Sequence, residues 1–95
     1  MNDEELALRR IAAQADRARA IIEDDLLVGA FEALEARFLM AWRRTEPADT
    51  AGRESIWHHL QALAEVRAEL NRVLEDGLIA RERLDELRAD RKSVV

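Results

Sequence analysis

TEPADTAG, the octet at residues 45–52, contains the only proline of the chain and interrupts a sequence with the pattern of helices. Pro47 cannot continue a helix, because it lacks a backbone donor and its ring clashes with the preceding turn. Trp42 precedes the octet and Trp57 follows it. We therefore expect the octet to form the corner of a helical hairpin, with both indole rings mostly buried and close together.

Composition favours an all-α fold in a single domain, residues 1–95. The chain has 3 Gly, 1 Pro and no Tyr or Cys, and charged residues make up 37% of it. Such usage is typical of long helices and coiled coils, and the shortage of aromatic and β-branched residues argues against a sheet. The acidic first residues lack the apolar stretch of a signal peptide, and no cysteine is present for a disulfide. We expect a cytoplasmic protein with no membrane partner.

Two apolar stripes precede the corner, each with the 3–4 spacing of one helix face. Continuing the first stripe beyond Ile22 would place Asp25 in the core, so the two stripes are out of phase. Asp24 or Asp25 is suited to cap a new helix. We therefore expect a kink or short break between Ile22 and Asp25, rather than one straight helix from 3 to 44. The first stripe comprises Leu8, Ile11, Ala15, Ala18 and Ile22, and the second Leu27, Phe31, Leu34, Phe38 and Ala41.

After the corner, Asp49 or Thr50 is suited to cap the second main helix. Asp76-Gly77 resembles a helix C-terminus, since glycine adopts the left-handed conformation there without steric cost. Alternatively, Gly77 is tolerated inside one long helix. The expected fold is an antiparallel hairpin core (24–78) with a thin N-terminal helix (1–23) and a short C-terminal helix, the latter within a partner-binding segment (79–95).

The apolar residues of the core exceed what two helices can cover. Leu39 and Met40 lie off the first helical seam of the hairpin, and Trp57 lies off the second. The remaining apolar surface needs another chain, so we expect a homo-oligomer. The residues expected at its interface are Phe31, Phe38, Leu39, Trp42, Trp57, Leu60, Leu63 and Leu70.

The net charge of −5 counts against duplex DNA as the main partner of one chain. We assign weak, non-specific DNA binding to the densest basic run outside the C-terminus, on the polar side of the first helix: Arg9, Arg10, Arg17 and Arg19. The C-terminal segment combines apolar residues with bases that suit an acidic groove on a partner. Its candidate contacts are Ile79, Arg83, Leu84, Leu87 and Arg88.

No catalytic, metal-binding or cofactor-binding set emerges. His58 and His59 are adjacent, so on a helix they point about 100° apart and cannot hold one ion together. Glu54 and His58 are four residues apart but lack a third ligand. The acidic run from Glu23 to Asp25 is better explained as a helix cap than as a cation site. We expect a protein that is not an enzyme and needs no cofactor.

One family resemblance covers residues 24–78. It comprises Asp25-Leu26-Leu27-Val28, Ala30-Phe31, Leu34-Glu35, Ala41-Trp42-Arg43, Asp49, Arg53-Glu54, Ile56-Trp57 and Glu75-Asp76-Gly77. This set resembles the small terminase subunit of tailed phages, prophages and gene transfer agents. The resemblance implies a helical-hairpin core that assembles into a ring and helps the large terminase take up DNA, with the C-terminal segment contacting that motor.

The resemblance lacks one part of the family pattern. Small terminases usually carry an N-terminal helix-turn-helix domain, and residues 1–23 form too thin a helix for one. A member of this kind would bind DNA weakly and without sequence preference. Two other functions remain open: a generic homo-oligomeric helical-bundle scaffold, and a regulator that binds one protein through its acidic middle. Seven or more subunits would favour the terminase, whereas a dimer or tetramer would favour the bundle.

Overall fold

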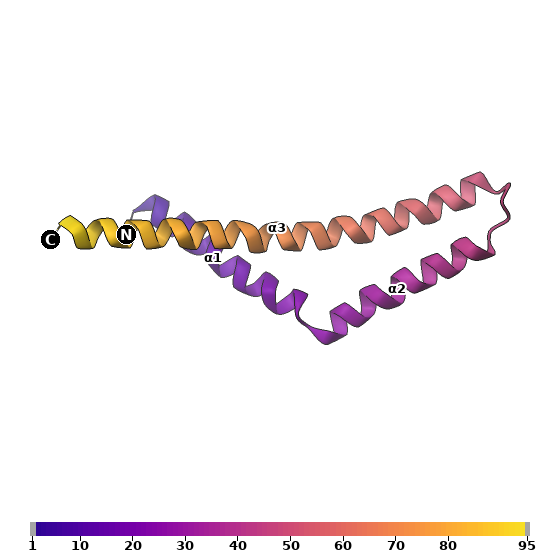
Figure 1. The fold of residues 1–95 in the computed structure, drawn as a ribbon, viewed down its shortest axis with the longest axis horizontal. Helices are drawn as coiled ribbons and strands as arrows, with labels where there is room; N and C mark the ends of the chain where they lie inside the picture. Colours follow the sequence, from indigo (N-terminus) through magenta and orange to yellow (C-terminus); the bar gives the residue numbers. More distant parts are fainter. Residues whose placement is uncertain (1, 95) are drawn as a thin grey trace. The chain divides into compact units, whose positions relative to one another are not determined.

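The computed structural model describes residues 2–94, and these residues are helical apart from short connections. The helices are α1 (Asp3–Ile22), α2 (Asp25–Arg44) and α3 (Thr50–Val94), and the described residues include no strand (Figure 1). The predicted all-α class is confirmed. Contacts divide the chain into two compact units. Unit 1 consists of α1 and the part of α3 from Leu70 onward, and unit 2 consists of Glu23–Glu69.

The predicted break between the first two helices is confirmed, and a side-chain cap explains it. Asp24 has an extended backbone (φ −69°, ψ 119°), and its Oδ1 accepts a hydrogen bond from the Leu27 N–H at 3.0 Å. Asn2 caps α1 in the same way, its Oδ1 accepting from the Glu5 N–H at 2.8 Å. Each cap satisfies a backbone donor that has no partner within its helix.

The octet at 45–52 forms the connection between α2 and α3, with Pro47 in a turn outside both helices as predicted. At the end of α2, the Thr45 hydroxyl and N–H both donate to the carbonyl of Trp42, at 2.6 and 3.1 Å. At the start of α3, Asp49 Oδ1 accepts from the Gly52 N–H at 3.0 Å, so Asp49 is the cap.

The expected helix end at Gly77 and the short C-terminal helix are wrong, and the alternative of a glycine inside one long helix is confirmed. The single helix α3 continues from Thr50 to Val94, and Gly77 has no positive φ. The glycine meets a packing requirement instead. A Cβ built at Gly77 would overlap the Cβ of Ala15 and lie 3.5 Å from the carbonyl oxygen of Ile11. Only a residue without a side chain allows the two helices to come this close.

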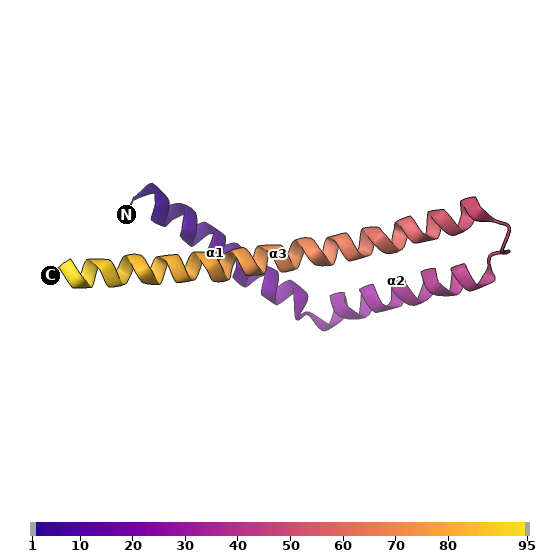
Figure 2. The ribbon, with the colours of Figure 1, turned by 45° about the horizontal axis from the view of Figure 1, so that its top comes forward.

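Unit 1 is a crossing of α1 over the C-terminal stretch of α3, drawn orange to yellow in Figure 1 and visible again in the turned view of Figure 2. The buried apolar side chains of the described residues are all alanines: Ala12, Ala15, Ala18 and Ala80. The predicted stripe is correct at Ala15 and Ala18, but Ile11 is exposed and Ala12 takes its place. The face is rotated because close approach at Gly77 favours the smaller side chains.

In unit 2, α2 packs against the first part of α3, and their contacts occur in antiparallel order. Arg67 Nη1 lies 2.7 Å from Glu35 Oε1, and its guanidinium lies 4.9 Å from the centre of the Phe31 ring. Nearer the corner, the rings of Phe38 and His59 are 5.2 Å apart. No residue from 23 to 69 is buried; of the stripe predicted for α2, Leu27, Phe31, Phe38 and Ala41 are half-buried and Leu34 is exposed. Unit 2 therefore has a seam between two helices but no enclosed core.

Candidate functional site

The residues predicted for the oligomer interface lie in two environments. Five are partly covered by the neighbouring helix: Phe31, Phe38, Leu60, Leu63 and Leu70. The last of these belongs to unit 1 and the other four to unit 2. Leu39 and Trp57 are 51% and 52% exposed, and Met40 and Val66 are also exposed. A large apolar surface is therefore left uncovered on unit 2.

The two tryptophans line one depression with Pro47, but they are not mostly buried as predicted. Trp42 is half-buried, and more than half of Trp57 is exposed. Arg53 explains the position of Trp42. Its guanidinium lies 4.3 Å from the centre of the indole ring, and its Nε donates to Thr45 Oγ1 at 2.9 Å. This cation–π contact holds the indole against the start of α3 while leaving part of it in solvent.

His58 and His59 face different neighbours. The His59 ring packs against Phe38, and its Nδ1 lies 2.6 Å from the Ser55 carbonyl oxygen. The His58 ring lies edge-on to Trp57, with 5.2 Å between ring centres. Within residues 2–94, no group of three His, Cys, Asp or Glu side chains is placed to hold a metal ion. The histidines thus extend the aromatic surface near the corner.

Unit 1 contains a cleft of about 460 Å³ between α1 and α3. Its lining combines guanidinium and carboxylate groups with alanine and leucine side chains. Two ion pairs cross it, Arg81 with Asp16 and Arg91 with Glu5. The lining residues are Glu5, Arg9, Ala12, Ala13 and Asp16 from α1, and Arg81, Leu84, Asp85, Leu87, Arg88 and Arg91 from α3.

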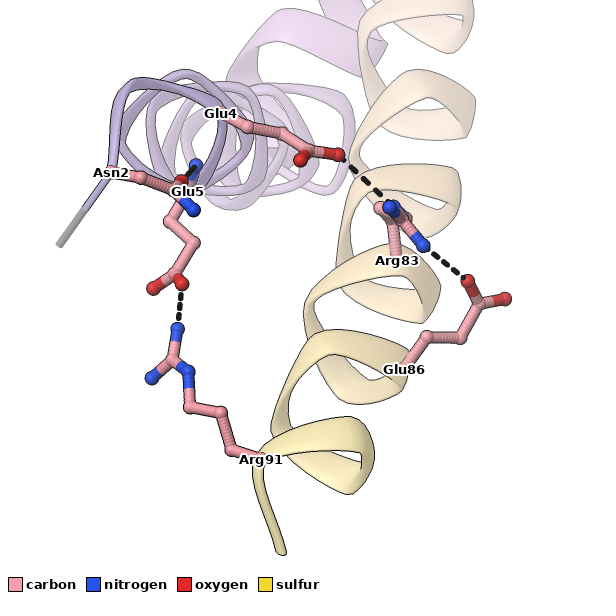
Figure 3. A network of polar contacts seen from close by, with 6 residues as sticks. All are labelled: Asn2, Glu4, Glu5, Arg83, Glu86 and Arg91. Atoms are coloured by element: carbon pink, nitrogen blue, oxygen red, sulfur yellow. Dashed lines mark hydrogen bonds and ion pairs between the residues drawn. The ribbon is translucent and has the colours of Figure 1, made fainter. Parts of the chain in front are cut away.

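A polar network ties the start of α1 to the last turns of α3 (Figure 3). Arg83 donates to Glu4 Oε1 and to Glu86 Oε2, both at 3.1 Å. The hydrogen bond to Glu4, followed by that to Glu86, raises the pKa of Arg83 above its ordinary value. Glu5, only 5% exposed, pairs with Arg91. Because the other partners are exposed, these ion pairs add little to the free energy of folding and serve mainly to orient α1 against α3.

The structure distributes the candidate DNA-binding residues over two surfaces, which corrects the expected single polar face. Arg9 lines the cleft against α3, as does Asp16. Arg10, Arg17 and Arg19 are exposed and lie outside the cleft. The four bases therefore do not form one continuous patch.

The candidate partner-binding residues also separate. Ile79 is 65% exposed and lies beside a second, shallower depression with Leu8 and Ile11. Arg83 is engaged with Glu4. The remaining three, Leu84, Leu87 and Arg88, line the same cleft as Arg9. One candidate for DNA, Arg9, and three candidates for the partner thus line the same cleft.

Sequence reasoning did not find the close contact of Gly77 with Ala15 or the ion pairs across the cleft. A signal was present for the first. Ala12 and Ala15 on one helix, and Gly77 and Ala80 on the other, are small residues at one-turn spacing. For the ion pairs there was none, because partners such as Asp16 and Arg81 are 65 positions apart.

Comparison with known proteins adds no identity: no family model, curated protein or solved structure matches the chain. Among the described residues, no helix is both long enough and apolar enough to cross a membrane.

Proposed function

We propose that the chain is a non-enzymatic, small terminase-like subunit that forms a homo-oligomer, assists a large terminase in DNA packaging and binds DNA only weakly. In this proposal, α2 and the first part of α3 form the antiparallel hairpin that repeats around the assembly. One observation carries the self-association: large apolar side chains of unit 2 remain exposed, whereas burial in the described residues is confined to small ones and Glu5.

The energetic argument starts from Leu39 and Trp57, both about half exposed. Full burial of a large apolar side chain contributes about 1.5–3 kcal/mol. Because the net stability of a domain is only about 5–15 kcal/mol, a few such side chains weigh heavily. Met40 and Val66 of the same unit are also exposed. A second copy that covers these groups supplies burial that the single chain lacks.

The packaging role is supported by the resemblance of residues 24–78 to small terminases. The net charge of −5 fits a subunit that bridges proteins rather than one that reads DNA. In this proposal the large terminase contacts the C-terminal part of α3, where Ile79 is largely exposed. A helical-bundle scaffold shares the uncovered apolar surface but does not account for the resemblance.

Light scattering on the purified chain tests the assembly. We expect a stable oligomer of 10.9 kDa subunits, with seven or more copies if the chain forms a terminase-type ring. A well-folded monomer would refute self-association, and a dimer or tetramer would favour the bundle scaffold. Co-purification with a co-expressed large terminase tests the partner.

Leu39→Asp locates the interface. Since Leu39 is 51% exposed, the substitution disturbs the single chain little. It would however bury an unpaired carboxylate in the oligomer, which costs several kcal/mol. We expect dissociation with helicity retained, measured by light scattering and circular dichroism. Leu6→Asp is the matched control, because Leu6 is an exposed leucine of unit 1. Equal loss of mass in both variants would remove unit 2 as the interface.

A further inference from the structure

Among the residues that the structure describes, two arginines in the cleft of unit 1 have no partner. Arg9 on α1 and Arg88 on α3 line it, and no ion pair or hydrogen bond joins either to another residue in the part of the chain that the structure describes. Of the acids in the cleft, Glu5 and Asp16 are paired and Asp85 is not. The unpaired groups therefore leave an excess positive charge beside the apolar side chains of Leu84 and Leu87, and the cleft is suited to a segment that carries both acids and a leucine.

Such a segment is present in the chain itself, at the break between α1 and α2. Glu23 and Asp25 are exposed and make no hydrogen bond or ion pair through their side chains among the described residues, whereas Asp24 is engaged as the cap. Leu26 follows directly and is 84% exposed, the highest value of any large apolar residue described. This acidic corner, residues 23–26, complements the cleft in charge and in apolar character.

The acidic corner cannot reach the cleft of its own chain. Arg9 lies within α1, and Glu23 follows directly after the last residue of that helix. The 13 residues between them are helical, so the 14 steps from Arg9 to Glu23 span about 21 Å. A continuous helix holds the two groups apart, so the occupant has to come from another copy.

We propose that the acidic corner of one subunit binds in the Arg9–Arg88 cleft of the next. Glu23 and Asp25 pair with the two free guanidiniums, and Leu26 packs on Leu84 and Leu87. The contact joins two different surfaces, so it repeats head to tail and closes into a ring when the rotation permits. This inference rests on the self-association proposed above and adds to it a second contact, made by the cleft of unit 1.

Duplex DNA is the less suitable occupant. Three carboxylates line the cleft beside its four guanidiniums, and phosphates placed there would face those acids. The apolar side chains that line the cleft also cannot make the charged and polar contacts that proteins use to bind a sugar–phosphate backbone. A leucine that follows two free carboxylates can contact both the guanidiniums and the apolar side chains of the cleft.

Charge exchange between subunits tests the contact. The cleft variant, Arg9→Glu with Arg88→Glu, changes the net charge per chain from −5 to −9, since each reversal shifts it by two. The corner variant, Glu23→Arg with Asp25→Arg, changes it to −1 and leaves the cap Asp24 in place. Each variant alone brings like charges together at the contact. An equimolar mixture pairs opposite charges at every contact and restores the average charge of −5.

The masses are measured by light scattering on full-length chains, with circular dichroism to verify helicity. We expect each variant alone to give a lower mass than the wild type, and the mixture to recover an assembly of alternating subunits. The control Arg10→Glu with Arg17→Glu makes the same charge change on α1 outside the cleft and should keep the wild-type mass. If the cleft variant loses helicity, the neutral variant Arg9→Gln with Arg88→Gln takes its place and should also lower the mass.

Three outcomes would overturn the contact. Wild-type mass in both variants would leave self-association intact but remove the cleft from it. Failure of the mixture to recover mass would show that the charges do not meet. Loss of binding to a labelled DNA duplex in the cleft variant, with its mass unchanged, would assign the cleft to phosphate. A monomeric wild type would instead refute the proposed oligomer itself.

Discussion

At the residue scale, Gly77 and Gly29 are both helical glycines, but only one has a neighbour. A Cβ at Gly77 would overlap Ala15, whereas a Cβ at Gly29 would meet nothing within 4 Å. Alanine is favoured over glycine in a helix by about 1 kcal/mol, so any difference between the two substitutions reports on packing alone.

We expect Gly29→Ala to raise the free energy of unfolding by about 1 kcal/mol. Gly77→Ala should lower it, because separating two packed helices costs about 1–3 kcal/mol and outweighs the same gain. Urea denaturation at one fixed protein concentration measures both, since oligomer stability depends on concentration. An equal gain in the two variants would mean that Ala15 and Gly77 are not in contact.

At the scale of the element, the start of α3 depends on one side chain. Asp49 accepts from the Gly52 N–H, and the Asp49 N–H donates to the carbonyl of Glu46 at 2.9 Å. The cap thus couples the helix to the corner that follows α2. Loss of the carboxylate leaves a helix donor to water and removes a negative charge from the positive end of the helix.

We expect Asp49→Ala to destabilise the chain by about 1 kcal/mol in urea denaturation. Glu46→Ala is the control, because it removes the same charge from the corner at a side chain that makes no hydrogen bond or ion pair within residues 2–94. The cap assignment would fail if the two variants were equally stable.

The sequence predicted the elements where the signal was local. Pro47, Asp24 and Asp49 determine helix ends through neighbouring atoms. Pro47 was placed correctly, and each cap was narrowed to two neighbouring residues, Asp24 or Asp25 and Asp49 or Thr50. The sequence left both a helix end and one long helix open at Gly77, because a glycine after an acid is the same local signal for both. Ala15, 62 positions away, decides between them.

The site was less accessible to prediction than the fold. Arg9 and Arg88 each belong to a basic run, and their common cleft depends on which face of α1 meets α3. That face is selected by the fit of small side chains around Gly77, which hydrophobic periodicity does not describe. The burial of Trp42 and Trp57 was overestimated because periodicity places a side chain on a face but gives no measure of its cover.

At the scale of the whole molecule, α3 is shared by both units. Its residues up to Glu69 pack with α2, and those from Leu70 onward pack with α1. The C-terminal stretch therefore covers α1, although the sequence analysis placed residues 79–95 in a partner-binding segment outside the core. An isolated helix of 20 residues with little burial is marginal in water.

We therefore expect deletion of residues 79–95 to remove the surface that packs on α1, which includes Ala80, together with the ion pairs to α1. Hydrogen exchange followed by mass spectrometry should show fast exchange across residues 3–22, with protection retained in 25–69. Ile79→Ala in the full chain is the control, because Ile79 is largely exposed. Unchanged protection of α1 in the truncated chain would show that the C-terminal stretch does not support it.

The alanine crossing of unit 1 has a thermal consequence. Heat capacity rises on unfolding in proportion to the apolar surface that becomes exposed. Separating α1 from α3 newly exposes mainly methyl groups, because the buried apolar residues are Ala12, Ala15, Ala18 and Ala80. Most charged side chains at the crossing are already in contact with solvent. The heat-capacity increment of this step is therefore small, and the curve of its stability against temperature is correspondingly flat. We expect α1 to detach gradually over a broad temperature range instead of at a sharp melting point.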